Sequence, residues 1–322
     1  MTTEGERFDR FMERALYAPE TGFFTSGRGS AGRRGDFLTS VEVGPLFGAV
    51  MARMLDTEWD RHDRPATFTV VDAGAGVGTL LRSILAAEPR CAGALDLVAV
   101  EIARTQHPGL PPQVRSSDEV PRVEVGVVIA NELLDNLPVR VLERTSEGWR
   151  ELHVVEGRAV VRPTELVGPD EVPVGARIPI AEAAVGWVRT TLDRIDSGRL
   201  VVIDYGADTA ELARRPAAGW LRTYRSHGRG GPPEEDPGSQ DITYDVPFDQ
   251  LPGGTRTTQA GWLRRHGIDA LVDEGRRIWA ERAAVADLGA LRARSRVREA
   301  EALVDPAGLG GFVVAEWQRP DL

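Results

Sequence analysis

The sequence predicts an α/β fold built on a doubly wound parallel sheet. Along most of the 322-residue chain, short apolar runs alternate with longer amphipathic segments, which is the pattern of strands connected by helices. Two of these runs, Phe68–Val71 and Leu200–Ile203, are apolar apart from Thr69, and an acid follows each. The first continues directly into three glycines at alternate positions and then into a helix-like pattern. A strand, a tight turn and a helix in this order are typical of a nucleotide-binding α/β sheet.

Two helices are expected before that first strand. In residues 4–17, apolar side chains recur at the spacing of one helical face. A second helix is expected from Pro45 to Trp59, with the proline in its first turn, where a missing N–H costs nothing. A loop rich in glycine and arginine, Ser26–Asp36, separates the two helices.

The remaining elements follow from periodicity and turn residues. Between Val139 and Arg162 the apolar residues alternate, which predicts an antiparallel hairpin insertion with a turn near Glu156–Gly157. The segment Gly228–Asp241 is rich in glycine, proline and acids and is expected to be a loop. The other expected elements are strands at Leu95–Glu101 and Val123–Ala130, a helix at Ile180–Ile195, a helix-rich stretch at Ile268–Leu303 and a closing strand at Phe312–Trp317.

The composition limits the possible functions. Forty-nine acids against 39 bases give a net charge of −10, which argues against nonspecific nucleic-acid binding. Every base is an arginine, which excludes Schiff-base and phosphate-loop lysines. The single cysteine, Cys91, excludes an internal disulfide, and the five scattered histidines suggest no metal site. Because no apolar run is long enough for a signal core or a membrane span, we expect a cytoplasmic protein with no membrane contact.

The glycine turn indicates which class of cofactor binds. A dinucleotide fingerprint reads G-x-G-x-x-G, whereas this turn has Asp72 followed by Gly74, Gly76 and Gly78, with Thr79 where the third fingerprint glycine would fall. A carboxylate at this place would repel a pyrophosphate but attract a cation. S-adenosylmethionine (SAM) carries an ammonium and a sulfonium and no phosphate. The turn therefore resembles motif I of class I SAM-dependent methyltransferases, and we expect these four residues to bind the cofactor.

Glu101 ends the second predicted strand, somewhat over twenty residues beyond the glycines. An acid at this place in nucleotide-binding α/β folds accepts hydrogen bonds from ribose hydroxyls. The alternative is a solvated strand end. We expect Glu101 to bind the ribose of SAM, because the turn already places the ligand nearby.

Asn131, Glu132 and Asp135 follow a strand that reads as buried on both faces. They would therefore lie at the carboxyl edge of the sheet, beside the transferable methyl group. Glu132 and Asp135 share a helical face if a helix starts here, so their carboxylates could hold a basic substrate. Asn131 could cap such a helix, a structural role that is compatible with catalysis. We expect all three residues to be catalytic and Asn131 also to contact the cofactor.

Further short motifs occur in a fixed order along the chain. They are FMERALYAPETGFF at 11–24, GDFLTS at 35–40 with PLFG at 45–48, ANELLDNLPV at 130–139, DYG at 204–206, DPG at 236–238 with DIT at 241–243, and QAGWL at 259–263. Together with the glycine turn they resemble the MidA-type methyltransferases, a family related to the mitochondrial complex I assembly factor that methylates arginine. The chain departs from the family pattern at Asp72, where Glu is usual, and at Leu133–Leu134, where an aromatic pair is usual.

The resemblance implies a class I methyltransferase, Rossmann-like core at 65–322, with inserted substrate-recognition segments at about 139–195 and 222–250. It implies a helical cap over the cofactor at 1–64. The cap loop would add Gly35, Asp36, Thr39 and Ser40 to the cofactor site. The substrate that the resemblance implies is an arginine side chain of a protein. Whether the protein forms a homodimer is left open at this point.

The reaction expected from these residues is an in-line transfer of the SAM methyl group, driven by the sulfonium. A carboxylate pair, Glu132 with Asp135, would bind two guanidinium nitrogens and concentrate electron density on the third. Two alternatives remain at this point. One is a non-catalytic assembly factor that binds SAM, and the other is a nicotinamide-dependent oxidoreductase, against which the glycine spacing and Asp72 argue.

Overall fold

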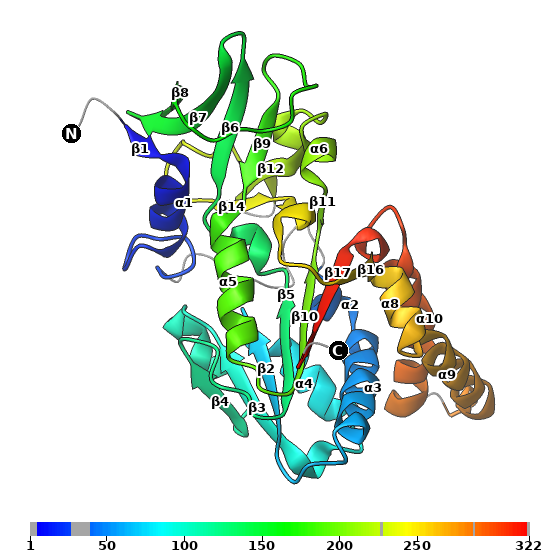
Figure 1. Ribbon diagram of the computed structural model, residues 1–322. Helices are drawn as coiled ribbons and strands as arrows, with labels where there is room; N and C mark the ends of the chain where they lie inside the picture. Colours follow the sequence, from blue (N-terminus) through cyan, green and yellow to red (C-terminus); the bar gives the residue numbers. More distant parts are fainter. Residues whose placement is uncertain (1–4, 27–38, 226–227, 286, 321–322) are drawn as a thin grey trace.

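A mixed seven-stranded sheet forms the centre of the computed structural model, which describes residues 5–26, 39–225, 228–285 and 287–320. The strand order is β16-β17-β10-β5-β2-β3-β4, and the five strands from β10 to β4 are parallel (Figure 1). β17 runs antiparallel to both of its neighbours. The strands are β2 Phe68–Ala73, β3 Leu95–Val100, β4 Val114–Ser117, β5 Gly126–Asn131, β10 Gly198–Asp204, β16 Thr255–Thr258 and β17 Val313–Arg319. The predicted α/β sheet is confirmed.

The sheet has its switch point between β2 and β5. From β2 the chain proceeds outward to β3 and β4, and it then returns to β5 and proceeds outward on the other side to β10. In open α/β sheets the crevice outside the carboxyl ends of the strands at such a point is where ligands bind. The glycine turn follows β2 and Glu132 follows β5, so topology alone brings these two segments together.

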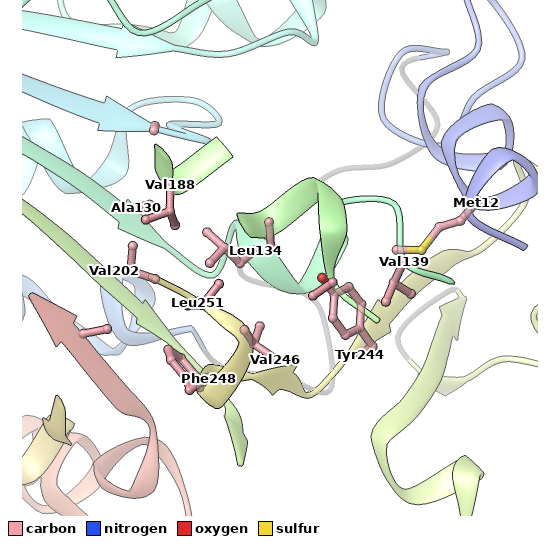
Figure 2. Packing of buried hydrophobic residues seen from close by; sticks show 14 of the residues in the cluster. Met12, Ala130, Leu134, Val139, Val188, Val202, Tyr244, Val246, Phe248 and Leu251 are labelled. Atoms are coloured by element: carbon pink, nitrogen blue, oxygen red, sulfur yellow. The ribbon is translucent and has the colours of Figure 1, made fainter. Parts of the chain in front are cut away.

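Two layers of apolar side chains cover the faces of the sheet. Along β2 and β5 the buried residues alternate, so that Val71 and Val128 join one cluster while Val70 and Val127 join the other. The first cluster contains α1 (Phe8–Tyr17) and α5 (Glu182–Asp193), and the second contains α3 (Pro45–Arg61), α4 (Thr79–Ala86) and α8 (Gln259–Arg265). Figure 2 shows the first cluster, in which Leu134 lies among Ala130, Val188, Val202 and Leu251.

A second sheet of five strands stands above the carboxyl end of the main one (Figure 1). Its strands are β1 Glu6–Arg7, β6 Arg140–Thr145, β7 Gly148–Val155, β8 Arg158–Pro163 and β9 Arg177–Ile180. β7 and β8 form the predicted hairpin, with Glu156 and Gly157 in its turn at φ values of 49° and 73°. Strands β9 and β1 were not predicted from the sequence. Because Glu6 and Arg7 pair with β7, α1 begins at Phe8 and not at residue 4.

The segment Gly228–Asp241 is not loop throughout, which corrects the prediction at both of its ends. Gly228–Arg229 forms β13 and Asp241–Tyr244 forms β14, and both pair with β12 (Leu221–Arg225). The other described elements are α2 Ser40–Val43, α6 Thr209–Leu212, α7 Ala217–Trp220, α9 Ile268–Arg282, α10 Leu288–Val304, β11 Gly206–Ala207, β15 Val246–Pro247 and the short 3-10 turns η1 Ala92–Ala94, η2 Arg104–Gly109, η3 Leu134–Asn136, η4 Phe248–Gln250 and η5 Leu309–Gly311.

The two helical parts of the segment 1–64 pack on opposite faces of the sheet. α1 joins the cluster that includes α5, whereas α3 packs against α4 in the other cluster. The division into a cap and a core stays a prediction. Within the described residues, the helices are all too short or too polar to cross a lipid bilayer.

Candidate active site

The turn after β2 requires glycine at three places. Gly74, Gly76 and Gly78 have φ values of 75°, 51° and 77°, in the left-handed region that side chains with a Cβ atom rarely adopt. Gly78 immediately precedes α4, and Gly74 donates its N–H to the carbonyl of Val100 at the end of β3. The turn therefore exposes bare backbone at the switch point of the sheet.

Glu101 is tied to this turn by its carboxylate. Its Oε2 accepts a hydrogen bond from the Gly76 amide at 2.9 Å, and its Oε1 accepts one from the Ala103 amide at 2.7 Å. The residue is 9% exposed. Each carboxylate oxygen can accept more than one hydrogen bond, so both keep capacity for ligand hydroxyls. The backbone donors fix the direction in which Glu101 presents them.

Asp72 lies beneath the turn, within β2, and is 3% exposed. Burial, together with the negative charge of Glu101, raises the pKa of Asp72 to about 7. A buried acid of this kind is ionised most readily when a cation approaches. The side chain is not among the residues that line the cavity described next.

A cavity of about 540 Å³ opens between the carboxyl ends of β2, β3 and β5. Of the predicted site residues, Gly74, Gly76, Glu101 and Glu132 line it. Asp72, Gly78, Asn131, Asp135, Thr39 and Ser40 do not line it, and Gly35 and Asp36 lie outside the described residues. Its other walls come from several elements: Glu13, Tyr17, Phe24, Ile102, Gln106, Asp118, Glu119, Leu137, Pro138, Trp187 and Arg194.

Glu132 follows β5 with a φ of 52°, a left-handed conformation that is uncommon for a residue with a side chain. Its Oε1 accepts a hydrogen bond from Asn131 Nδ2 at 3.1 Å and a longer one from the Ser40 amide at 3.4 Å. Burial and the neighbouring charge of Asp135 raise the pKa of Glu132 to about 8. No described cationic side chain forms an ion pair with Glu132.

The helix expected after Asn131 does not form, which corrects the sequence analysis. Only one 3-10 turn, Leu134–Asn136, follows β5, because Glu132 already has a left-handed backbone. Glu132 and Asp135 therefore do not share a helical face. Asp135 is 4% exposed and its Oδ2 accepts hydrogen bonds from the hydroxyls of Tyr205 and Thr243.

Some buried acceptor oxygens near Glu132 have no donor among the described residues. They are Oδ1 of Asn131, Oδ1 of Asp135 and Oγ1 of Thr39. A buried acceptor without a donor costs free energy, and none of these three residues lines the cavity. Among the described residues, no group of His, Cys and carboxylate side chains is arranged to hold a metal ion.

The aromatic wall of the cavity and the partners of Asp135 were not predicted from the sequence. Tyr17 and Phe24 stack with ring centroids 5.7 Å apart, and the Tyr17 hydroxyl donates to the Asn136 carbonyl at 2.9 Å. Both residues lie in the block at 11–24, and Tyr205 and Thr243 lie in the DYG and DIT motifs. The motifs were thus visible in the sequence, but their contacts were not.

Comparisons with known proteins show the family to which the chain is similar. Residues 50–266 match the family described as "Putative S-adenosyl-L-methionine-dependent methyltransferase". The chain is 26% identical over 317 residues to "Protein arginine methyltransferase NDUFAF7, mitochondrial" of Danio rerio, with 81% of this chain and 72% of that protein covered. For the Bos taurus protein of the same name the identity is 26% over 315 residues, covering 80% and 69%.

A solved structure from Burkholderia thailandensis, bound to S-adenosyl-homocysteine (SAH), resembles the chain with a TM-score of 0.79. The two sequences are 29% identical, and the match covers 98% of this chain and 88% of the other. In this chain Gly76 and Glu101 are joined by a hydrogen bond, and both line the cavity. The family model spans well over half of the sequence, and the chain therefore belongs to this family of SAM-dependent methyltransferases.

Proposed function

We propose that this methyltransferase transfers the methyl group to an arginine side chain of a partner protein. The observation that carries the proposal is the buried carboxyl group of Glu132, which belongs to a residue lining the cavity and forms no ion pair with any described cationic side chain. A guanidinium carries five N–H donors and a positive charge, so it would complement this carboxyl group better than a neutral acceptor would. The NDUFAF7 relatives carry the name protein arginine methyltransferase, which supports the same acceptor.

The turn after β2 and the residues around it would bind the cofactor. Gly74, Gly76 and Gly78 would let SAM approach the backbone, with Asp72 supplying negative charge beneath its amino end. Glu101 would accept hydrogen bonds from the ribose. Thr39 and Ser40, at the start of α2, would close the site from that side.

Asn131 would orient Glu132, to which it already donates a hydrogen bond. Glu132 would contact the guanidinium directly, and its charge would hold one end of the acceptor so that another nitrogen faces the methyl group in line. Alignment of this kind supplies a large part of the rate in a displacement reaction. The carboxylate of Asp135 is bound by Tyr205 and Thr243, and Asp135 does not line the cavity. Asp135 would therefore act on the acceptor only through its negative charge, from behind Glu132.

The experiment that tests the acceptor uses SAM with a tritiated methyl group. The purified protein is incubated with a lysate of host cells that lack its gene, and labelled proteins are digested and sequenced by mass spectrometry. The proposal expects methylated arginine. Label on another side chain would leave the methyltransferase and reject arginine, and a protein that binds SAM but labels nothing would favour a binding role. The cytoplasmic location stays a prediction, because the named relatives are mitochondrial.

Replacing Glu101 by Ala is expected to weaken SAM and SAH equally, by about 1–3 kcal/mol, because the lost hydrogen bonds to a charged group involve the ribose that both ligands share. Calorimetric titration of both ligands measures this. The variant Glu101→Gln keeps one acceptor oxygen and the side-chain shape, so its affinities should lie between those of the wild type and Glu101→Ala. Unchanged affinities in both variants would contradict the ribose contact.

The preference for SAM over SAH should rise with pH. Below about 8 the Glu132 carboxyl is largely protonated and neutral, and above it the carboxylate attracts the sulfonium that only SAM carries. The ratio of the two dissociation constants should therefore shift toward SAM between pH 6.5 and pH 9. Asp72, with a pKa of about 7, should affect both ligands alike, because both carry the same amino group. In Glu132→Gln the ratio should be independent of pH, and a ratio that still changes would assign the titration to another group.

A further inference from the structure

The DYG and DIT motifs meet at the segment that carries Glu132, although they are far from it in the sequence. The Tyr205 hydroxyl donates a hydrogen bond to Asp135 Oδ2, although the two residues are 70 positions apart in the sequence. The Thr243 hydroxyl donates to the same oxygen at 2.5 Å, across 108 residues. The two hydroxyls also contact each other. We call Asp135, Tyr205 and Thr243 the hydroxyl clamp.

The backbone next to the clamp is fixed as well. The Asp204 Oδ2 atom accepts hydrogen bonds from the amides of Leu134 at 2.9 Å and Asp135 at 3.2 Å. The Glu132 amide donates to the carbonyl of Ile203 at 2.8 Å. The carboxyl end of β10 thus determines the path of the chain directly after Glu132.

A further set of contacts holds Asn136, at the far end of the same short turn. Its Nδ2 donates to Asp241 Oδ1 at 2.9 Å and to the carbonyl of Ile242 at 3.1 Å. Its carbonyl accepts the hydroxyl of Tyr17. Leu134 anchors the turn from below, since its side chain is fully buried among the residues shown in Figure 2.

This density of contacts exceeds what a surface turn needs. Asp135, Asp204 and Thr243 are 4%, 0% and 1% exposed, and burying two carboxylates is costly unless donors reach them. These buried groups surround the short segment that begins at Glu132, a residue that has a strained φ and lines the cavity. Strain of this kind persists where the surrounding structure fixes it, and such places cluster at active sites.

We propose that Tyr205 and Thr243 are positioning residues for methyl transfer: through Asp135 they hold the segment that presents Glu132 to the acceptor. The inference rests on the role proposed above for Glu132. Neither hydroxyl lines the cavity, so neither touches SAM or the acceptor. Their effect is therefore expected on the rate of transfer and not on the affinity for SAM.

The variants Thr243→Val and Tyr205→Phe remove each hydroxyl and keep the size of the side chain. Each is expected to lower the rate of methyl transfer from tritiated SAM into lysate proteins by about 10- to 100-fold, the cost of a small misplacement of a reacting group. The dissociation constant for SAM should stay within about twofold. Thr243→Ser keeps the hydroxyl and should restore most of the rate, which a requirement for the shape of threonine alone would not do.

Two neighbouring residues provide matched controls. Thr223 lies on the adjacent strand β12, is also buried, and donates instead to the carbonyl of Gly231 at 2.6 Å. Tyr244 is fully buried next to Thr243, and its hydroxyl has no hydrogen-bond partner among the described residues. Thr223→Val and Tyr244→Phe should therefore transfer methyl groups at nearly the wild-type rate.

A double-mutant cycle separates this inference from the proposed function. If Thr243 acts through Glu132, then Thr243→Val should slow the wild type but hardly slow Glu132→Gln. Equal slowing in both backgrounds, or no slowing in the wild type, would overturn the positioning role. A full rate in Glu132→Gln would instead reject the role of Glu132 itself. Thermal melts of all variants identify any that fail to fold. If Thr243→Val is one of them, the transfer rate of Thr243→Ser tests the positioning role instead.

Discussion

Glu132→Gln should lower the rate of methyl transfer by about 100- to 1000-fold, the loss that follows when a charge-stabilising group is removed from a transition state. Glutamine keeps an oxygen that can accept from Asn131 Nδ2, so the shape of the site should persist. At pH 7 the affinity for SAM should hardly change, because the Glu132 carboxyl, with a pKa of about 8, is mostly neutral there before the acceptor arrives. The positive charge of a guanidinium would then favour its ionised form.

Single-turnover transfer from tritiated SAM, measured beside calorimetric SAM binding, checks this result. Glu13→Gln is the matched control, because Glu13 also lines the cavity but is half exposed and paired with Arg10 at 2.8 Å. It should retain most of the rate. Equal losses of rate in both variants would indicate that the total negative charge of the cavity matters and not the position of Glu132. A full rate in Glu132→Gln would show that Glu132 does not act in the transfer.

Gly76→Val should abolish binding of both SAM and SAH while the fold survives. A β-branched residue at φ 51° has a strained backbone conformation, which typically costs about 1–3 kcal/mol of folding free energy. Its Cβ would also lie 3.1 Å from Gln106 Oε1, in the space into which Gly76 now opens. The strain is small against the stability of a domain of this size, but the added atoms occupy the ligand's place.

Calorimetry with both ligands and a thermal melt measure the two effects separately. Gly93→Val is the control, because a Cβ at Gly93 meets nothing within 4 Å and the residue lies in an exposed 3-10 turn. Gly76→Ala adds one carbon at the same place and should bind more weakly than wild type but more tightly than Gly76→Val. Binding by Gly76→Val at the wild-type level would refute the placement of the cofactor against this turn.

The parts of the site that follow from local rules could be predicted from the sequence. The glycine turn is one, because three alternate glycines after an apolar run indicate left-handed backbone at the end of a strand. The hairpin turn at Glu156–Gly157 is another. Glu101 was placed correctly at the end of β3 because its distance from the glycines equals one helix and one strand.

The rest depends on contacts between distant residues. The helix expected at Glu132 and Asp135 was wrong because the spacing of two acids says nothing about the φ of Glu132, whose amide is bound by the carbonyl of Ile203 in β10. The partners of Asp135 are Tyr205 and Thr243, and no local pattern indicates that a hydroxyl 108 residues away reaches a given carboxylate. The strand β1 was likewise invisible, since two residues show no periodicity.

The place of β17 in the main sheet has a consequence for how the chain folds during synthesis. This strand begins at Val313, yet it pairs in the sheet interior, between β10 and β16. Until it has left the ribosome, the backbone groups along one side of β10 have no partner, and an open apolar strand edge is a template for wrong pairing. The main sheet can therefore close only after residues 313–319 have left the ribosome, and until then the nascent chain is exposed to aggregation and chaperone capture.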